Sequence, residues 1–208
     1  MKIRFCWLGM IFMVVFTLAS TQLMAQGRHK NLDFVFIIDK SLSMRTKIVH
    51  VENYIVEHFL NDRVIVGDTV TVIDFFGKAV LLDSRVVRST SDLQTLKHEI
   101  DLIRADGRWT DIGNAVDFAH DWVKAHIQPS LRSYYVLFTD GRQEAPPGSK
   151  YASSNFKVVH PFLLHSIKEE HPGWERIIVD AETSSESSEI AALAGQIAHD
   201  IGITKNID

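Results

Sequence analysis

Short apolar runs and amphipathic segments alternate along the chain from residue 31 onward. Residues 34–38 form a continuous apolar run that ends at Asp39, which is typical of a buried parallel strand. Apolar residues then recur at spacings of three and four between Met44 and Phe59, which predicts an amphipathic helix. The folded part of the chain is therefore expected to begin with a strand followed by a helix.

The middle of the chain repeats this alternation. Two apolar runs around Gly77 predict a hairpin, because a glycine between strand-like segments marks a tight turn. Ser91 and Gln94 have the spacing of a capping box and should open a helix, and a second helix should begin near Thr110. The expected elements are strands at 70–75, 79–87 and 134–138 and helices at 91–103 and 110–128.

Beyond residue 141 the pattern is weaker. Prolines and glycine predict a loop at 142–150, and strand candidates follow at 158–164 and 176–179. A final amphipathic helix is expected at 183–201. Three acidic residues in this part of the chain indicate a solvated loop, namely Glu169, Glu170 and Glu175.

The order of these elements predicts the fold class. Strands separated by helices imply a mostly parallel sheet that is covered on both faces. We therefore expect an α/β, Rossmann-like, doubly wound fold with helices on both faces and one antiparallel edge strand. A single domain accounts for residues 31–205.

The first 25 residues have the pattern of a secretory signal peptide. Lys2 and Arg4 precede an uncharged run, and the expected cleavage point follows Ala25. An uncleaved anchor is the alternative, because the run is about long enough to span a bilayer. Both interpretations export the rest of the chain to a periplasmic or extracellular location. We expect membrane association only if the segment is uncleaved.

Composition and charge narrow the classes of function. The 208 residues carry 22 basic and 26 acidic side chains, so the chain lacks the basic footprint of a nucleic-acid-binding protein. Cys6 is the only cysteine and lies in the predicted signal peptide, which excludes a disulfide or cysteine-based zinc site in the exported part. The ten histidines form no zinc-binding helix motif, and the sequence has no nucleophile elbow or phosphate-binding glycine loop.

Oxygen-bearing side chains follow two predicted strands and open one predicted helix. Asp39, Ser41 and Ser43 come after the first strand, Thr110 begins a helix, and Asp140 follows a later strand. In doubly wound folds, ligands bind at the carboxyl ends of the strands, so we expect these side chains to converge there. Carboxylates and hydroxyls are hard oxygen donors that suit Mg²⁺, Mn²⁺ or Ca²⁺. The sequence therefore predicts a divalent metal site.

These five residues resemble the metal-ion-dependent adhesion site of the von Willebrand factor type A (vWA) domain family. The family pattern is Asp-x-Ser-x-Ser, then a Thr, then an Asp after a later strand. The resemblance also includes the order of the elements and spans about 31–205. It implies that the hydroxyls of Ser41, Ser43 and Thr110 contact the metal directly. It implies that Asp39 and Asp140 act largely through waters.

The resemblance implies a binding module and not an enzyme. Nearly neutral direct ligands leave the cation electrophilic, so an open coordination position would accept an Asp or Glu carboxylate from a protein partner. Leu42 and Trp109 stand at positions where the family commonly has glycine. Trp109 could restrict its loop, or it could be an exposed aromatic anchor that binds the partner.

Two other hypotheses remain open at this point. An Asp after the first strand of an α/β sheet can be a phosphoryl-accepting nucleophile in an Mg²⁺-dependent enzyme, and Asp39 has this position. Phosphatases of the haloacid dehalogenase type carry a second Asp two residues later, where this chain has Ser41. The chain could also be a scaffold with an idle or absent metal that serves assembly of an envelope complex.

Overall fold

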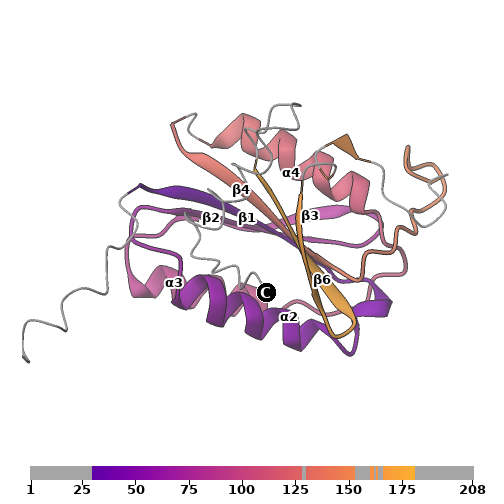
Figure 1. Ribbon diagram of the computed structural model, residues 1–208, viewed down its shortest axis with the longest axis horizontal. Coiled ribbons are helices and arrows are strands. Elements are labelled where there is room, and N and C mark those ends of the chain that lie inside the picture. The colour runs from indigo at the N-terminus through magenta and orange to yellow at the C-terminus, as the bar shows by residue number, and fades with distance from the viewer. Residues whose placement is uncertain (1–29, 128–129, 153–159, 162, 164–165, 181–208) are drawn as a thin grey trace, which may run out of the picture. The chain divides into compact units, whose positions relative to one another are not determined.

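The computed structural model describes residues 30–127, 130–152, 160–161, 163 and 166–180. The predicted signal peptide and the predicted final helix lie outside these residues. Within them, six strands form one sheet with helices on both faces (Figure 1). The strands are β1 (Leu32–Asp39), β2 (Thr69–Phe75), β3 (Ala79–Val86), β4 (Arg132–Thr139), β5 (Ile167–His171) and β6 (Trp174–Asp180).

The described helices are short. Their bounds are α2 (Ile48–Ile55), α3 (Thr90–Asp101) and α4 (Ile112–His126). A 3₁₀ turn, η1 (Leu42–Met44), precedes α2, and a π-helical segment, η2 (Val56–Asn61), follows it, so the predicted helix between Met44 and Phe59 is divided into three pieces. In the part of the chain that the structure describes, none of the helices has the length and apolarity needed to cross a bilayer.

The strand order is β3-β2-β1-β4-β6-β5. β1 pairs in parallel with both β2 and β4, which places it inside the sheet. β3 runs antiparallel to β2 at one edge, and β6 runs antiparallel to its neighbours β4 and β5. Four strands therefore share one direction, and the predicted mostly parallel sheet with an antiparallel edge strand is confirmed. The reversed direction of β6 was not part of the prediction.

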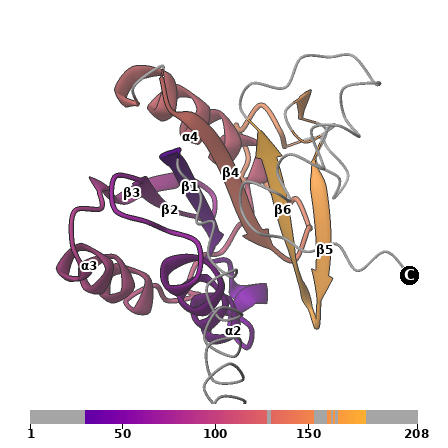
Figure 2. The ribbon, with the colours of Figure 1, turned by 60° about the vertical axis from the view of Figure 1, so that its left-hand side comes forward.

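Alternate residues of β1 belong to two different apolar layers. Phe34, Phe36 and Ile38 pack in the layer that contains α2 and α3, whereas Val35 and Ile37 pack in the layer that contains α4. Figure 2 shows these helices on opposite faces of the sheet. Successive side chains of a strand point to opposite faces, so a strand covered on both faces needs apolar residues at every position. This explains the continuous apolar run that predicted β1.

The capping box of α3 lies two residues before its predicted position. The N-cap is Ser89 and not Ser91, and the box partner is Asp92 and not Gln94. The Asp92 carboxylate accepts hydrogen bonds from the backbone N–H of Ser89 at 3.1 Å and of Arg88 at 2.8 Å. These bonds lower the pKa of Asp92. A charged carboxylate is a stronger acceptor at a helix N-terminus than a neutral amide, so Asp92 determines where α3 begins.

The last two strands differ most from the sequence prediction. The described residues of the strand candidate at 158–164 are not in a strand, whereas 176–179 is confirmed as part of β6. Glu169 and Glu170 lie on β5 and Glu175 lies on β6, so their assignment to a loop is wrong. β5 is an edge strand whose side chains alternate between half-buried and exposed. Such a strand tolerates charged residues, which removes the apolar signal.

Asp33 places a fully buried carboxyl on β1, between Thr69 of β2 and Ser133 of β4. Burial raises the pKa of Asp33 to about 7, the nearby hydroxyl of Ser133 opposes this rise, and the charge of Asp68 adds to it. The native protein thus keeps a proton that the unfolded chain loses above its ordinary pKa of 3.8. The stability that this proton provides is complete at low pH and is lost as the pH rises through 7.

We expect Asp33→Asn to flatten the fall in unfolding free energy between pH 4.5 and 8, since an amide cannot lose a proton. The wild-type slope from this one group is at most about 1.4 kcal/mol per pH unit. Urea unfolding at each pH, in buffer with chelator, measures the slope. Asp121→Asn, at an exposed position of α4, is the control. An unchanged slope in Asp33→Asn would contradict the prediction.

Candidate metal-binding site

The loop after β1 and the loop before α4 are joined through their backbones. Leu42 N donates to Gly107 O at 2.8 Å, and Gly107 N donates to Lys40 O at 3.0 Å. Gly107 permits this approach, because a Cβ atom at its position would lie 2.2 Å from Cβ of Phe76. The two predicted serines therefore lie beside the segment that leads to Thr110.

The loop after β4 is attached to the same segment. Thr110 and Glu144 exchange two backbone hydrogen bonds of 2.9 and 2.7 Å. Gln143 donates from Nε2 to Asp111 Oδ1 at 2.9 Å, while its Oε1 accepts from Ile112 N at 2.8 Å. Since β1 and β4 are adjacent and parallel, the loops after both strands emerge at the same edge of the sheet, the one formed by the carboxyl ends of these strands. Thr110 lies on a segment that is bonded to both loops.

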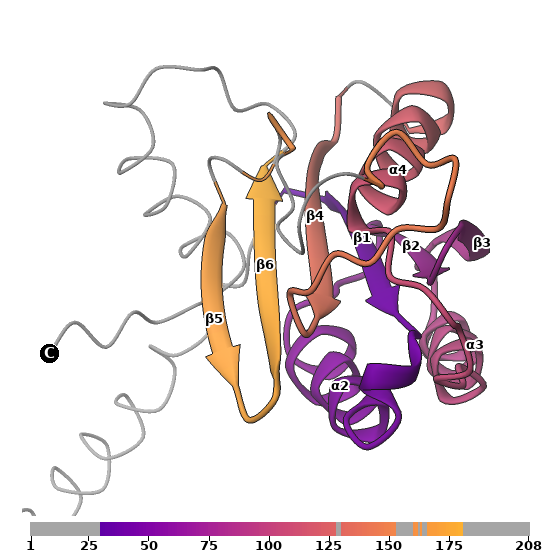
Figure 3. The same ribbon diagram turned by 90° about the vertical axis from the view of Figure 1, so that its right-hand side faces the viewer.

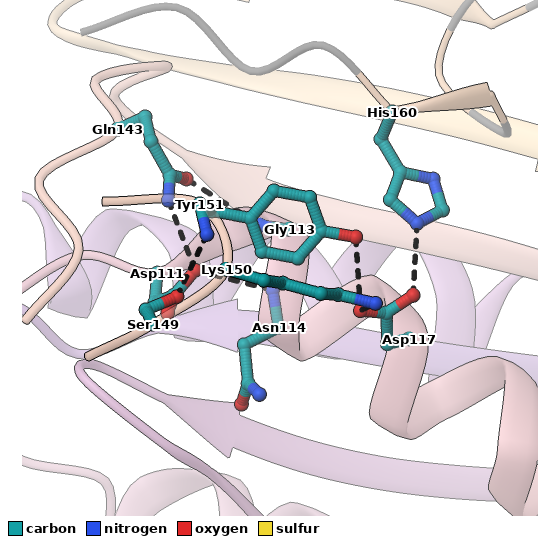
Figure 4. A network of polar contacts seen from close by, with 9 residues as sticks. All are labelled: Asp111, Gly113, Asn114, Asp117, Gln143, Ser149, Lys150, Tyr151 and His160. Atoms are coloured by element: carbon teal, nitrogen blue, oxygen red, sulfur yellow. Dashed lines mark hydrogen bonds and ion pairs between the residues drawn. The ribbon is translucent and has the colours of Figure 1, made fainter. Parts of the chain in front are cut away.

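A second network fastens residues 149–151 to α4 (Figure 4). Asp117 accepts a hydrogen bond from the Tyr151 hydroxyl at 2.9 Å, and its carboxylate lies 2.7 Å from Lys150 Nζ and 3.2 Å from Nε2 of the buried His160. The Tyr151 ring occupies the space over Gly113, where a Cβ atom would come within 2.5 Å of it. The loop after β4 is thus held on α4 at two places, one of them next to Thr110.

Asp39 organises the loop that follows β1. Its Oδ1 accepts the backbone N–H of Ser41 at 2.8 Å, and its Oδ2 accepts the hydroxyl of Thr139, the last residue of β4, at 2.7 Å. The Oγ atoms of Ser41 and Ser43 are 3.0 Å apart. The structure therefore brings Asp39, Ser41 and Ser43 together. Thr139 is an additional polar contact that the sequence motif did not include.

Two carboxyl groups lie near each other at the carboxyl ends of these strands, Asp39 and Asp140, and the charge of Asp140 acts on Asp39. Burial raises the pKa of Asp39 to about 6, hydrogen bonds from Thr139 and Ser41 oppose this rise, and the charge of Asp140 adds to it. An acid whose ionised form is disfavoured by burial and by a second acid is stabilised in that form by a nearby cation. The electrostatics of this edge therefore favour a positive group.

The two carboxylate oxygens of Asp140 have different surroundings. Oδ2 lies 3.4 Å from Nζ of Lys47, which precedes α2. Oδ1 is buried and has no hydrogen-bond partner among the described residues. A buried carboxylate oxygen without a partner is unfavourable by about 1–3 kcal/mol or more, because the oxygen has lost its water. This oxygen is suited to a donor or cation from outside the chain.

The predicted ligands form a set of oxygen donors with few charges. Ser41 and Thr110 are buried, whereas Ser43 is exposed. No hydrogen bond joins the Thr110 hydroxyl to the serines or aspartates in the described part of the chain. Over the same residues, no group of three or more His, Cys, Asp or Glu side chains could hold a metal ion. Two carboxylates and three hydroxyls fit a hard cation such as Mg²⁺ better than zinc or copper.

Trp109 is half-buried and packs on the turn between β2 and β3. A Cβ atom at Gly77 in that turn would lie 3.2 Å from Cβ of Trp109. The guanidinium of the exposed Arg108 lies 4.9 Å from the centroid of the Trp109 ring. Leu42, which is joined to Gly107 through its backbone, is 44% exposed. We call Leu42, Arg108 and Trp109 the rim of the candidate site.

Comparisons with known proteins found one similar sequence and several similar solved structures. The chain is 29% identical over 151 residues to an uncharacterized protein of Treponema pallidum (strain Nichols). The aligned region covers 72% of this chain and 68% of that protein. The solved structure of BatB from Bacteroides thetaiotaomicron aligns with a TM-score of 0.47 at 17% identity, over 84% of this chain and all of that one. A von Willebrand factor type A protein from Catenulispora acidiphila aligns with a TM-score of 0.44 at 20% identity, over half of this chain but only a quarter of that one.

The family itself is identified by a match over more than half of the chain. The sequence profile of the von Willebrand factor type A domain matches residues 34–143. This range begins in β1, ends in the loop after β4 and includes all five predicted metal ligands. The chain belongs to the von Willebrand factor type A domain family.

Proposed function

We propose that this protein is an exported, divalent-metal-dependent binding module of the adhesion or assembly type. In this proposal a metal ion, Mg²⁺ or else Mn²⁺ or Ca²⁺, captures an Asp or Glu carboxylate of a protein partner. The observation that carries the proposal is the arrangement of Asp39. Its buried carboxyl is bonded to the loop after β1 and to the last residue of β4, and the hydroxyls of Ser41 and Ser43 lie in contact next to it.

The resemblance to the family assigns the ligand roles in this proposal, and the contacts of Asp39 fit the role assigned to it. Ser41, Ser43 and Thr110 hold the ion with their hydroxyl oxygens. Asp39 already accepts hydrogen bonds on both of its oxygens, which suits a residue that orients a serine and acts on the ion through water. The bound ion supplies an electrophile for the carboxylate of the partner.

The same contacts are unfavourable for phosphoryl transfer by Asp39. The side chain is fully buried, and the Ser41 N–H and the Thr139 hydroxyl each bond one of its oxygens, which reduces the access of a substrate and the nucleophilicity of the carboxylate. Ser41 stands where a second carboxyl would be needed as a general acid. We therefore favour binding over turnover.

The chemistry of the rim indicates which kind of partner surface would fit the candidate site. Leu42 and Trp109 offer apolar area beside the ligand residues, and Arg108 adds a positive charge. Tryptophan and arginine are enriched among residues that contribute most to protein–protein binding. A partner that presents a carboxylate next to an apolar side chain matches this combination. The N-terminal pattern at 1–25 supports a partner on the exported side of the membrane.

Mg²⁺ should stabilise the protein against heat, since the native state alone holds the assembled ligands. At an ion concentration 100 times the dissociation constant, the expected gain is about 2.7 kcal/mol, or several degrees in the unfolding temperature. Thr110→Val removes one hydroxyl ligand with little change in shape and should abolish most of this gain. Thermal unfolding with and without Mg²⁺ measures both effects.

Thr95→Val on α3 is the matched control, because the Thr95 hydroxyl bonds only within its helix, to Ser91 O at 3.0 Å. This variant should keep the full response to Mg²⁺. A response of wild-type size in Thr110→Val would remove Thr110 from the ligand set. A scaffold that binds no metal would give no response in any of the three proteins.

Capture of a partner should depend on both the metal and the rim. Immobilised protein should retain specific proteins from an envelope extract in Mg²⁺ and release them in EDTA. Trp109→Ala should weaken retention about tenfold or more if the indole is an anchor. Trp122→Ala, which removes an indole stacked on His126 of the same helix α4, is the control. Retention that is equal in Mg²⁺ and EDTA would contradict the proposed function.

A further inference from the structure

Lys47 places a positive charge of the chain's own at the candidate site. Its Nζ lies 3.4 Å from Oδ2 of Asp140, although the two residues are 93 positions apart in the sequence. The side chains of Lys47 and Asp140 are only 24% and 13% exposed. Solvent and salt screen such a pair less than an ion pair on the open surface. The contact therefore joins the start of α2 to the loop after β4 with appreciable strength.

The turn between β5 and β6 holds the Lys47 side chain in this position. A Cβ atom at Gly173 in that turn would lie 3.0 Å from Cε and 3.5 Å from Cδ of Lys47. Gly173 has a φ of +83°, a conformation that other residues rarely adopt, so the position remains without a side chain. β6 pairs with β4 in antiparallel register, which puts this turn at the carboxyl end of β4, where Asp140 follows (Figure 3).

The neighbouring lysine does not share this role. Lys40 directs its ammonium to Asp74 at 3.3 Å and to Asp106 at 3.6 Å. The oxygens of Asp39 accept hydrogen bonds from Ser41 and Thr139. Of these two lysines, Lys47 is the one whose charge meets a carboxylate of the candidate site.

We propose that Lys47 is a built-in competitor of the divalent ion. This inference rests on the proposed metal site. In protein stripped of divalent ions, the Lys47 ammonium neutralises Asp140. When a dication binds at Ser41, Ser43 and Thr110, the two positive charges repel each other and compete for one carboxylate. Because this repulsion is relieved when the ammonium moves away from Asp140, ion binding displaces Lys47, and the Lys47–Asp140 pair lowers the apparent affinity for the ion.

The consequence is a threshold in the ion concentration at which the protein can bind its partner. The free energy needed to separate Lys47 from Asp140 is subtracted from the free energy of ion binding, so the pair determines the concentration at which the ion enters. The same pair reduces the repulsion between the carboxylates of Asp39 and Asp140 when the ion is removed. Lys47 is thus a positioning residue that adjusts metal affinity without being a metal ligand.

The test compares Mg²⁺ binding by full-length wild-type protein, Lys47→Met and Lys97→Met, using calorimetry. Methionine keeps the apolar stem that crosses Gly173 but removes the charge. We expect Lys47→Met to bind Mg²⁺ about tenfold more tightly than wild type and to unfold at a lower temperature in EDTA. Lys97→Met controls for net charge, because it removes a lysine paired with Asp101 on α3, and it should behave as wild type.

The outcomes separate this inference from the proposed function. Equal Mg²⁺ affinity in wild type and Lys47→Met, or weaker affinity in the variant, overturns the role of Lys47 and leaves the metal site standing. Absence of Mg²⁺ and Mn²⁺ binding in both proteins overturns the metal site and this inference together. Binding by Lys47→Met at concentrations where wild type does not bind supports the competitor role.

A second measurement uses the unmodified protein and so does not depend on a variant that folds. Acylation of lysine ε-amino groups, quantified by mass spectrometry, should rise several-fold at Lys47 when Mg²⁺ is added, because the released ammonium becomes more accessible. Lys97 serves as the internal reference. Unchanged acylation of Lys47 in a sample that binds Mg²⁺ would overturn the inference.

Discussion

The buried carboxyl of Asp39 is the contact on which the candidate site depends. A carboxyl without water is unfavourable unless it is hydrogen-bonded, and here the two bonds come from Ser41 in the loop after β1 and from Thr139 at the end of β4. Asp39 therefore holds together two segments that are 100 residues apart in the sequence. The position of the serine hydroxyls relative to Asp140 follows from this link.

The other loops of the candidate site are held next to Asp39 mainly by hydrogen bonds between uncharged groups. Backbone bonds from Gly107 and Thr110 attach the loop before α4, and Gln143 and Tyr151 fasten the loop after β4 to α4. Mostly neutral ligands leave a cation electrophilic, which suits capture of a carboxylate from a partner. Lys47 adds a positive charge next to Asp140, which in our proposal neutralises this carboxylate when no ion is bound.

Local patterns predicted the parts of this structure that depend on local chemistry. The apolar run at 34–38 indicated a strand buried on both faces. The short spacing from Asp39 to Ser43 indicated that these residues lie close together, and the two serine hydroxyls are in contact in the structure. Contacts between distant segments have no such signature, which is why Thr139 and Lys47 were missed. β5 escaped prediction because an edge strand needs no apolar face, and its charged residues resemble a loop.

Two sequence signals were incomplete for physical reasons. The sequence pattern predicted the capping box of α3 at Ser91 and Gln94, whereas the structure has it at Ser89 because the charged Asp92 is the stronger acceptor. Trp109 could be read as a constraint or as an anchor. The structure shows a half-buried indole that packs on the β2–β3 turn, and its role as an anchor for a partner stays a prediction.

The most direct test of the metal site is anomalous diffraction from crystals grown with Mn²⁺. The account predicts one strong peak within direct coordination distance, about 2–2.5 Å, of the hydroxyl oxygens of Ser41, Ser43 and Thr110. Asp39 should remain bonded to Ser41 and Thr139. A peak at another place on the protein, or a crystal with bound Mn²⁺ only at lattice contacts, would contradict the account.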